Sequence, residues 1–109
     1  MPQFDVYENT DNATRRAYPY FVDIQSDLLD TLNSRVAIPL GNIEGQKYPQ
    51  TLCPNVELQG AAYVLLTHQL ASVRAGNLGK PVGSLADQRD MIVAAIDLLV
   101  TGIRSVQQD

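Results

Sequence analysis

The side chains best suited to chemistry in this 109-residue chain begin with its one cysteine and its one histidine. Cys53 stands between Leu52 and Pro54 and has no basic neighbour in sequence to lower its pKa, so we interpret it as a small buried apolar side chain. His68 has no carboxylate three or four residues away, which indicates an exposed histidine at the end of a strand rather than a metal ligand. These two residues predict no catalytic group, no metal site and no cofactor.

Basic side chains offer a second kind of chemistry. Arg15 and Arg16 are adjacent, and together with Lys47 and His68 they would make a patch that binds phosphate or cleaves RNA. The alternative is a solvated pair of charges in a loop, which we favour because the surrounding residues are polar turn formers.

Carboxylates gather in two places. An extended segment would send Asp23 and Asp27 to one face and Asp30 to the other, which does not favour a pair of acids that share a proton. Asp90 and Asp97 are seven residues apart and fall on one face of a predicted helix. That face is either a solvated surface or an acidic strip for a basic partner.

Composition excludes several classes of function. Eight Lys and Arg against twelve Asp and Glu give a net charge of −4, so direct binding to nucleic acid is not expected. A chain of 109 residues predicts a single domain, and a deep cavity for a large cofactor would compete with its core. The N-terminus has no signal-peptide pattern and no apolar run reaches the length of a membrane span, so we expect no membrane partner and a cytoplasmic protein.

Several short strands and one helix must position these residues. Alternating or β-branched apolar patterns predict strands at residues 3–7, 18–24, 35–40, 55–59, 61–67 and 72–74. The strands at 55–59 and 61–67 flank Gly60, which predicts a hairpin with a tight turn. Polar or Gly- and Pro-rich segments predict loops at residues 8–17, 41–54 and 75–83. Leu28 and Leu29 cannot both point inward from an extended segment.

The clearest predicted element is a C-terminal helix of about 17 residues. Ser84 and Asp87 resemble a capping box, so the helix is expected to start at Ser84 or Leu85. It is expected to end near Thr101, where Gly102 suits a left-handed cap. Its apolar stripe comprises Leu85, Ile92, Ile96, Leu99 and Ile103. Further apolar residues lie off that stripe in its second half, so the helix should contact a second surface. Strands followed by one helix predict a mainly β domain, either α+β or a small barrel.

Longer blocks of sequence point to a family. The residues concerned are 3–7, the block Tyr-Phe-Val-Asp-Ile-Gln-Ser-Asp-Leu-Leu-Asp at 20–30, Ile-Pro-Leu at 38–40, and residues 91–103, which end in Thr-Gly-Ile. In this order and spacing the chain resembles the CcdB family of toxins from toxin–antitoxin systems. The resemblance implies a homodimer of a small antiparallel SH3-like barrel, of the CcdB/MazF toxin type, with a C-terminal helix. The single domain covers residues 1–109, and residues 104–109 form a tail outside the resemblance.

The resemblance also implies a function that needs no enzyme chemistry. Toxins of this family bind the A subunit of DNA gyrase and trap its complex with cleaved DNA. A CcdA antitoxin neutralises the toxin, and the pair represses its own operon through the DNA-binding domain of the antitoxin. Two alternatives stay open: a MazF-like endoribonuclease, and a binding module of this fold that has lost gyrase poisoning.

Site residues follow from the resemblance position by position. It places gyrase contacts at Leu28, Leu29, Asp97, Val100, Thr101, Gly102 and Ile103. The best-known family pattern has Trp where this chain has Thr101, so a cation–π contact of about 0.5–2 kcal/mol with a gyrase arginine is missing. Asp97 or Asp90 would pair with the same arginine instead. The two long polar loops predict antitoxin contacts at Glu8, Asn9, Asp11, Arg15, Arg16, Asn42 and Glu44.

Overall fold

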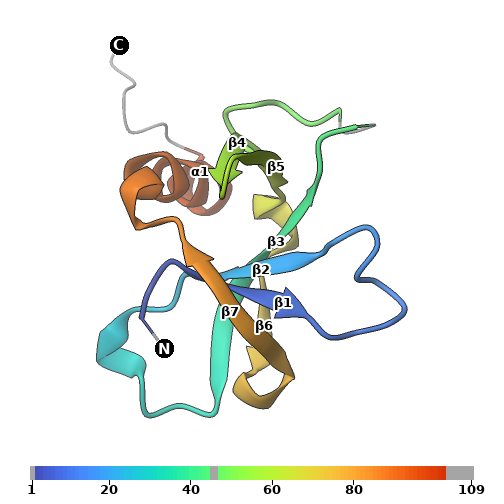
Figure 1. Cartoon of the computed structure of the whole chain (residues 1–109). Helices are drawn as coiled ribbons and strands as arrows, with labels where there is room; N and C mark the ends of the chain where they lie inside the picture. Colours follow the sequence, from blue (N-terminus) through green and yellow to red (C-terminus); the bar gives the residue numbers. More distant parts are fainter. Residues whose placement is uncertain (1, 45–46, 103–109) are drawn as a thin grey trace.

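The computed structural model describes residues 2–44 and 47–102. Within that part of the chain an antiparallel sheet is followed by one α-helix, α1 (Arg89–Thr101), as Figure 1 shows. The strands are β1 (Asp5–Asn9), β2 (Tyr20–Asp23), β3 (Ser34–Asn42), β4 (Asn55–Leu58), β5 (Ala61–Leu65), β6 (Ala71–Arg74) and β7 (Leu78–Ser84). The predicted fold class, mainly β with a C-terminal helix, is confirmed.

The sheet bends around β3, its longest strand. Strand order is β4-β5-β3-β2-β1-β7, and β6 also pairs with β3. The first part of β3 pairs with β6, with Ala37 opposite Ala71, while its last part pairs with β5, with Leu40 opposite Leu65. Because β3 pairs first with β6 and then with β5 along the same edge, the sheet curls into a half-barrel.

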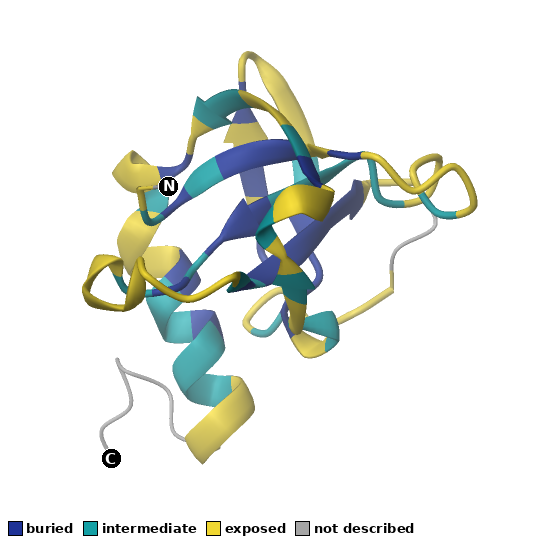
Figure 2. Ribbon diagram, turned by 90° about the horizontal axis from the view of Figure 1, so that it is seen from below, coloured by how far each residue is buried: buried dark blue, intermediate teal, exposed yellow. Residues whose placement is uncertain are grey.

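One apolar core joins the sheet to the helix. Val22 and Ile38 from the sheet and Ile92 from α1 are fully buried and belong to the same cluster. Burying a side chain of this size contributes about 1.5–3 kcal/mol. Leu85 and Ile96 of the predicted helix stripe also join this cluster, whereas Leu99 is exposed. Figure 2 shows the buried strands beside α1 and the exposed last turn of that helix.

The predicted hairpin around Gly60 is confirmed. Leu58 of β4 pairs with Ala61 of β5, which leaves Gln59 and Gly60 as a two-residue turn. Their φ angles are 53° and 82°, and positive φ at both positions is the requirement of the type I′ turn that suits the twist of paired strands.

The loop predicted at residues 75–83 is wrong, because β7 occupies most of it and pairs with β1. Gly79 and Pro81 break the strand pattern in the sequence, but β7 lies at the edge of the sheet, where Pro is tolerated. Gly79 also permits close approach of β1: a Cβ atom there would lie 2.9 Å from Thr10 Cγ2 and 3.0 Å from the Glu8 carbonyl oxygen.

The predicted start of the helix is also wrong, whereas its end is confirmed. Ser84 is the last residue of β7, and its Oγ accepts a hydrogen bond from the N–H of Ala86 at 3.1 Å. A 3-10 turn (Ala86–Gln88) follows, so α1 begins only at Arg89. Gly102 adopts the left-handed conformation with φ 74°, as expected for the cap. No helix in the described residues has the length and apolar character to span a bilayer.

Candidate functional site

Residues 26–30 form an exposed turn, which we call the leucine turn. Its centre is a 3-10 helix, η1 (Asp27–Leu29), whose N-cap Ser26 accepts a hydrogen bond from the N–H of Leu28 at 3.2 Å. Leu28 is 92% exposed and Leu29 is 50% exposed, so neither side chain belongs to the core. Two adjacent large apolar side chains on the surface are typical of an interaction site.

An ion-pair network ties the leucine turn to the sheet. The Nε of Arg35 lies 2.8 Å from Asp23 Oδ2, and its Nη1 lies 2.9 Å from Asp30 Oδ1. Asp23 and Asp30 therefore meet on one guanidinium, and the prediction that they point to opposite faces is wrong because the segment turns instead of extending. Burial lowers the pKa of Arg35, but the hydrogen bond and charge of Asp23, with those of Asp30, outweigh burial and raise that pKa.

Amide groups complete the attachment of the turn. Gln25 donates from Nε2 to the Leu29 carbonyl at 3.0 Å, and its Oε1 accepts from the N–H of Val36 in β3, also at 3.0 Å. At the N-terminal end of the turn, the backbone N–H of Gln3 donates to Asp27 Oδ1 at 2.8 Å. Sequence reasoning missed Gln25 and Arg35; the available signal was a charged residue at the start of an otherwise apolar strand.

The C-terminal end of α1 is the second predicted part of the gyrase site. Val100 is 72% exposed, and Asp97 is half-buried. Thr101 donates from Oγ1 to the Asp97 carbonyl at 2.7 Å, while the Gly102 N–H donates to the carbonyl of Leu98 at 3.0 Å and closes the helix. The last predicted contact, Ile103, lies outside the described residues.

One protomer does not bring these two parts together. In Figure 1 the leucine turn, drawn in cyan, projects beside the lower part of the sheet, whereas α1 covers the upper part. A single surface that contains both parts therefore requires another molecule to supply one of them.

Most of the residues predicted to contact the antitoxin lie in or beside the loop at residues 10–19. Asn42, at the end of β3, donates from Nδ2 to the Arg16 carbonyl at 3.0 Å and so attaches this loop to the sheet. Glu8, Arg15 and Arg16 line a hollow of about 350 Å³ beside Tyr20. Glu44 is exposed in the turn that follows β3.

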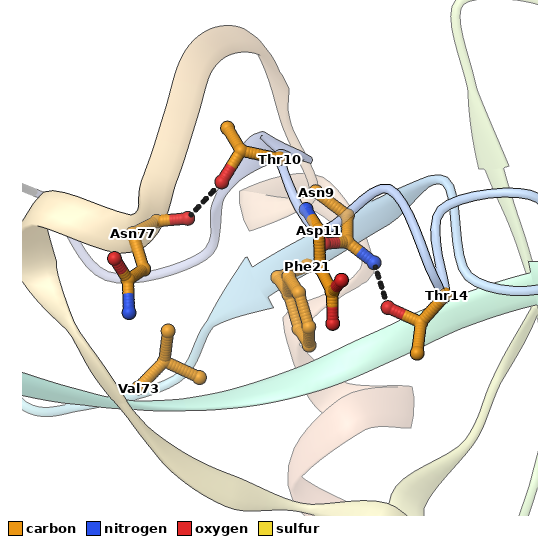
Figure 3. A pocket seen from close by; sticks show the side chains of 7 residues that line it. All are labelled: Asn9, Thr10, Asp11, Thr14, Phe21, Val73 and Asn77. Atoms are coloured by element: carbon orange, nitrogen blue, oxygen red, sulfur yellow. Dashed lines mark hydrogen bonds between the residues drawn. The ribbon is translucent and has the colours of Figure 1, made fainter.

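Asn9 shapes this loop from inside. It is 5% exposed, and its Nδ2 donates to Thr14 Oγ1 at 3.0 Å and to the Tyr18 carbonyl at 2.8 Å. Its Oδ1 accepts from the N–H of Asp11 at 2.9 Å. Asn9, Asp11 and Phe21 line a hollow of about 360 Å³. Figure 3 shows these side chains around it. Asn9 therefore presets the conformation of this loop, and its buried side chain, although predicted to contact the antitoxin, is not exposed to a partner.

Comparison with known proteins identifies the family. The model of the CcdB protein family matches residues 3–102. This chain belongs to the CcdB family. It is accordingly a toxin of a toxin–antitoxin system.

A solved structure supports the fold of this CcdB-family chain. It is the structure of an endoribonuclease in complex with its cognate antitoxin, from Mycobacterial species. The TM-score is 0.75 and the alignment covers 100% of both chains, at 11% sequence identity. Identity at this level shows a shared fold, and the predicted CcdB/MazF type of small β fold is confirmed.

The single thiol of the CcdB-family chain has a neighbour that sequence reasoning missed. Cys53 is 2% exposed, as expected, but its Sγ lies 3.4 Å from Nδ1 of His68, which is exposed in a 3-10 turn (Thr67–Gln69). The ring of Tyr48 lies 4.4 Å from the imidazole ring. Burial raises the pKa of the Cys53 thiol, and backbone hydrogen bonds of Thr67 and His68 offset this effect only in part. The thiol therefore stays protonated near neutral pH.

This raised pKa predicts a loss of stability in alkali. In the unfolded chain the thiol ionises first, so the free energy of unfolding should fall as pH rises from about 8 to about 9.5. In Cys53→Ala that fall should be smaller, because Tyr7 and Tyr63, whose pKa values are also raised by burial, ionise mainly at higher pH. Urea unfolding of both proteins at the two pH values measures the difference. Equal falls in the two proteins would contradict the assignment to Cys53.

Proposed function

We propose that this CcdB-family toxin is a homodimer that binds the A subunit of DNA gyrase and traps gyrase on cleaved DNA. The observation that carries the proposal is the leucine turn, where Leu28 and Leu29 stand exposed at positions that the family resemblance assigns to gyrase contacts. The network of Arg35 fixes their backbone, as expected for a surface selected to bind rather than to pack internally.

The exposed apolar side chains of α1 support the proposed homodimer. Met91 and Leu99 are exposed on that helix, and a second copy would cover part of this apolar surface. Two-fold symmetry would present two leucine turns and two helix ends to a partner that is itself two-fold symmetric. Such a dimer supplies the composite surface that one protomer lacks.

Binding alone accounts for the proposed activity, so we infer that the toxin is not an enzyme. Within residues 2–44 and 47–102, the arrangement most like a nucleophile with its base is the contact of Cys53 with His68, and burial keeps that thiol protonated. The basic patch considered above gains no support, since the hollow lined by Arg15 and Arg16 includes neither Lys47 nor His68.

We propose that the antitoxin neutralises the toxin by binding to the 10–19 loop and to the end of β3. A segment of a CcdA-type antitoxin would lie across the hollows beside Arg15, Arg16 and Asn42. Repression of the operon would then pass through the DNA-binding domain of the antitoxin, because the toxin itself carries a net charge of −4. In an NMR titration with the antitoxin segment, backbone signals of this loop should shift, and unchanged signals would contradict the assignment.

A MazF-like endoribonuclease is the second candidate, because this chain shares its fold with the mycobacterial endoribonuclease described above. Incubation of purified toxin with a single-stranded RNA in the presence of a chelator distinguishes RNA cleavage from gyrase poisoning. Cleavage that follows the concentration of toxin would favour the endoribonuclease, whereas intact RNA favours gyrase poisoning.

A third possibility is a binding module that has lost gyrase affinity through Thr101 or through residues 104–109, which lie outside the described residues. Deleting residues 104–109 distinguishes these cases, since a gain in toxicity would indicate that the tail masks the site.

Calorimetric titration of the gyrase A subunit with the toxin tests the proposal. We expect saturable binding with one toxin dimer for each dimer of the A subunit. Failure to bind at concentrations far above the micromolar range would overturn it, whatever the toxicity in cells.

A further inference from the structure

We propose that Asp30 and Arg35 are positioning residues for gyrase binding, which they support by holding the leucine turn in its binding conformation. The inference rests on the proposed function of that turn. Neither residue is among the predicted gyrase contacts, and Arg35, with 1% of its side chain exposed, is not available to touch a partner.

Arg35 links a rigid part of the molecule to an exposed one. The backbone of Arg35 belongs to β3, and its side-chain Nε lies 2.8 Å from the carboxylate of Asp23 in β2, which is completely buried. The other arm of the guanidinium, Nη1, reaches Asp30 at 2.9 Å, and 54% of the Asp30 side chain is exposed. A planar fork that donates in two directions suits this task, whereas a lysine ammonium has no such fixed geometry.

Asp30 transmits that anchoring to the two leucines. Its backbone N–H donates to the Asp27 carbonyl at 3.2 Å and closes the 3-10 turn that carries Leu28 and Leu29. The carboxylate of Asp30 therefore fixes the C-terminal end of the turn, while Gln25 holds the Leu29 carbonyl from the side of the sheet.

Fixing the turn before binding raises affinity without adding a contact. Ordering a loop at an interface costs free energy, and a loop that is already ordered avoids this cost. If only a fraction of molecules holds the turn correctly, the apparent dissociation constant rises by the inverse of that fraction.

Asp30→Asn tests the inference, because it removes the charge from Asp30 and leaves the buried pair of Asp23 and Arg35 intact. We expect the affinity for the gyrase A subunit to fall about five- to tenfold, from a corresponding loss of ordered turn. Affinity for the antitoxin segment and the midpoint of urea unfolding should stay near those of the parent protein. Hydrogen exchange at the Leu29 amide should become faster.

Asp87→Asn is the matched control, since Asp87 is an exposed acid in the 3-10 turn before α1 and its loss changes net charge equally. This control should bind gyrase like the parent. Unchanged gyrase affinity in Asp30→Asn, or equal losses for gyrase and antitoxin, would overturn the positioning role. Normal binding by Leu28→Asp would instead overturn the proposed function itself, so the two failures are distinguishable.

Discussion

Leu28→Asp is expected to lower the affinity for the gyrase A subunit by at least about 100-fold, because a central apolar contact is replaced by a charge that must be desolvated. Leu28 is 92% exposed, so the free energy of unfolding should change by no more than about 0.5 kcal/mol. Calorimetry with the A subunit and urea unfolding measure the two quantities on the same protein.

Leu32→Asp is the matched control for this substitution. Leu32 is 51% exposed, lies just beyond the leucine turn and is not a predicted gyrase contact. It should retain gyrase binding within a fewfold of the parent. Normal binding by Leu28→Asp, or an equal loss in both variants, would contradict the assignment of the contact to Leu28.

Arg35→Ala is expected to lower the free energy of unfolding by about 3–5 kcal/mol, since it leaves the carboxylate of Asp23 buried without its partner. The side chains of Arg35 and Asp23 are 1% and 0% exposed, so water does not replace the lost ion pair without rearrangement. Urea unfolding at neutral pH measures the loss. This is the largest effect on stability that we expect from one substitution of a charged residue.

Arg74→Ala is the control for Arg35→Ala. Arg74 lies opposite Ser34 in the pairing of β3 with β6, but it is exposed, so its loss should cost no more than about 0.5 kcal/mol. A double substitution, Asp23→Leu with Arg35→Met, should lose less than Arg35→Ala, because no buried charge is then left without its partner and only the half-exposed Asp30 loses its ion pair. A stability of Arg35→Ala equal to that of the parent would contradict the network.

Elements with a strong local signal were predictable. Residues 35–40 are rich in apolar and β-branched side chains and form the centre of β3, which is mostly buried. Gly60 marks the hairpin of β4 and β5 because its turn requires positive φ. Gly102 marks the end of the helix for the same reason. Such features depend on a few neighbouring residues, which the sequence displays directly.

Features that depend on distant residues were not predictable from local patterns. Strand β7 contains Gly79 and Pro81, and it exists because β1 lies beside it, about seventy residues earlier in the sequence. Arg35 is twelve residues from Asp23, and His68 is fifteen residues from Cys53. Because no helical or strand period joins such positions, the ion-pair network and the thiol contact emerge only from the fold.

The candidate gyrase site contains one part that the sequence predicted and one feature, the distance between its two parts, that only the fold revealed. The resemblance assigned Leu28 and Leu29 by position, and their exposure agrees with a role in binding. However, the helix end belongs to another part of the protomer, as Figure 1 shows, so the complete site depends on the proposed dimer. Oligomeric state at micromolar concentration, measured by sedimentation, would show whether that second copy is present.

Cleavage of supercoiled plasmid by gyrase tests the central proposal most directly. Toxin, gyrase and ATP are incubated with the plasmid, and the protein is then digested before electrophoresis. We predict linear DNA that increases with toxin concentration and is absent with Leu28→Asp. Linear DNA that is absent even at a large excess of the parent toxin would contradict gyrase poisoning.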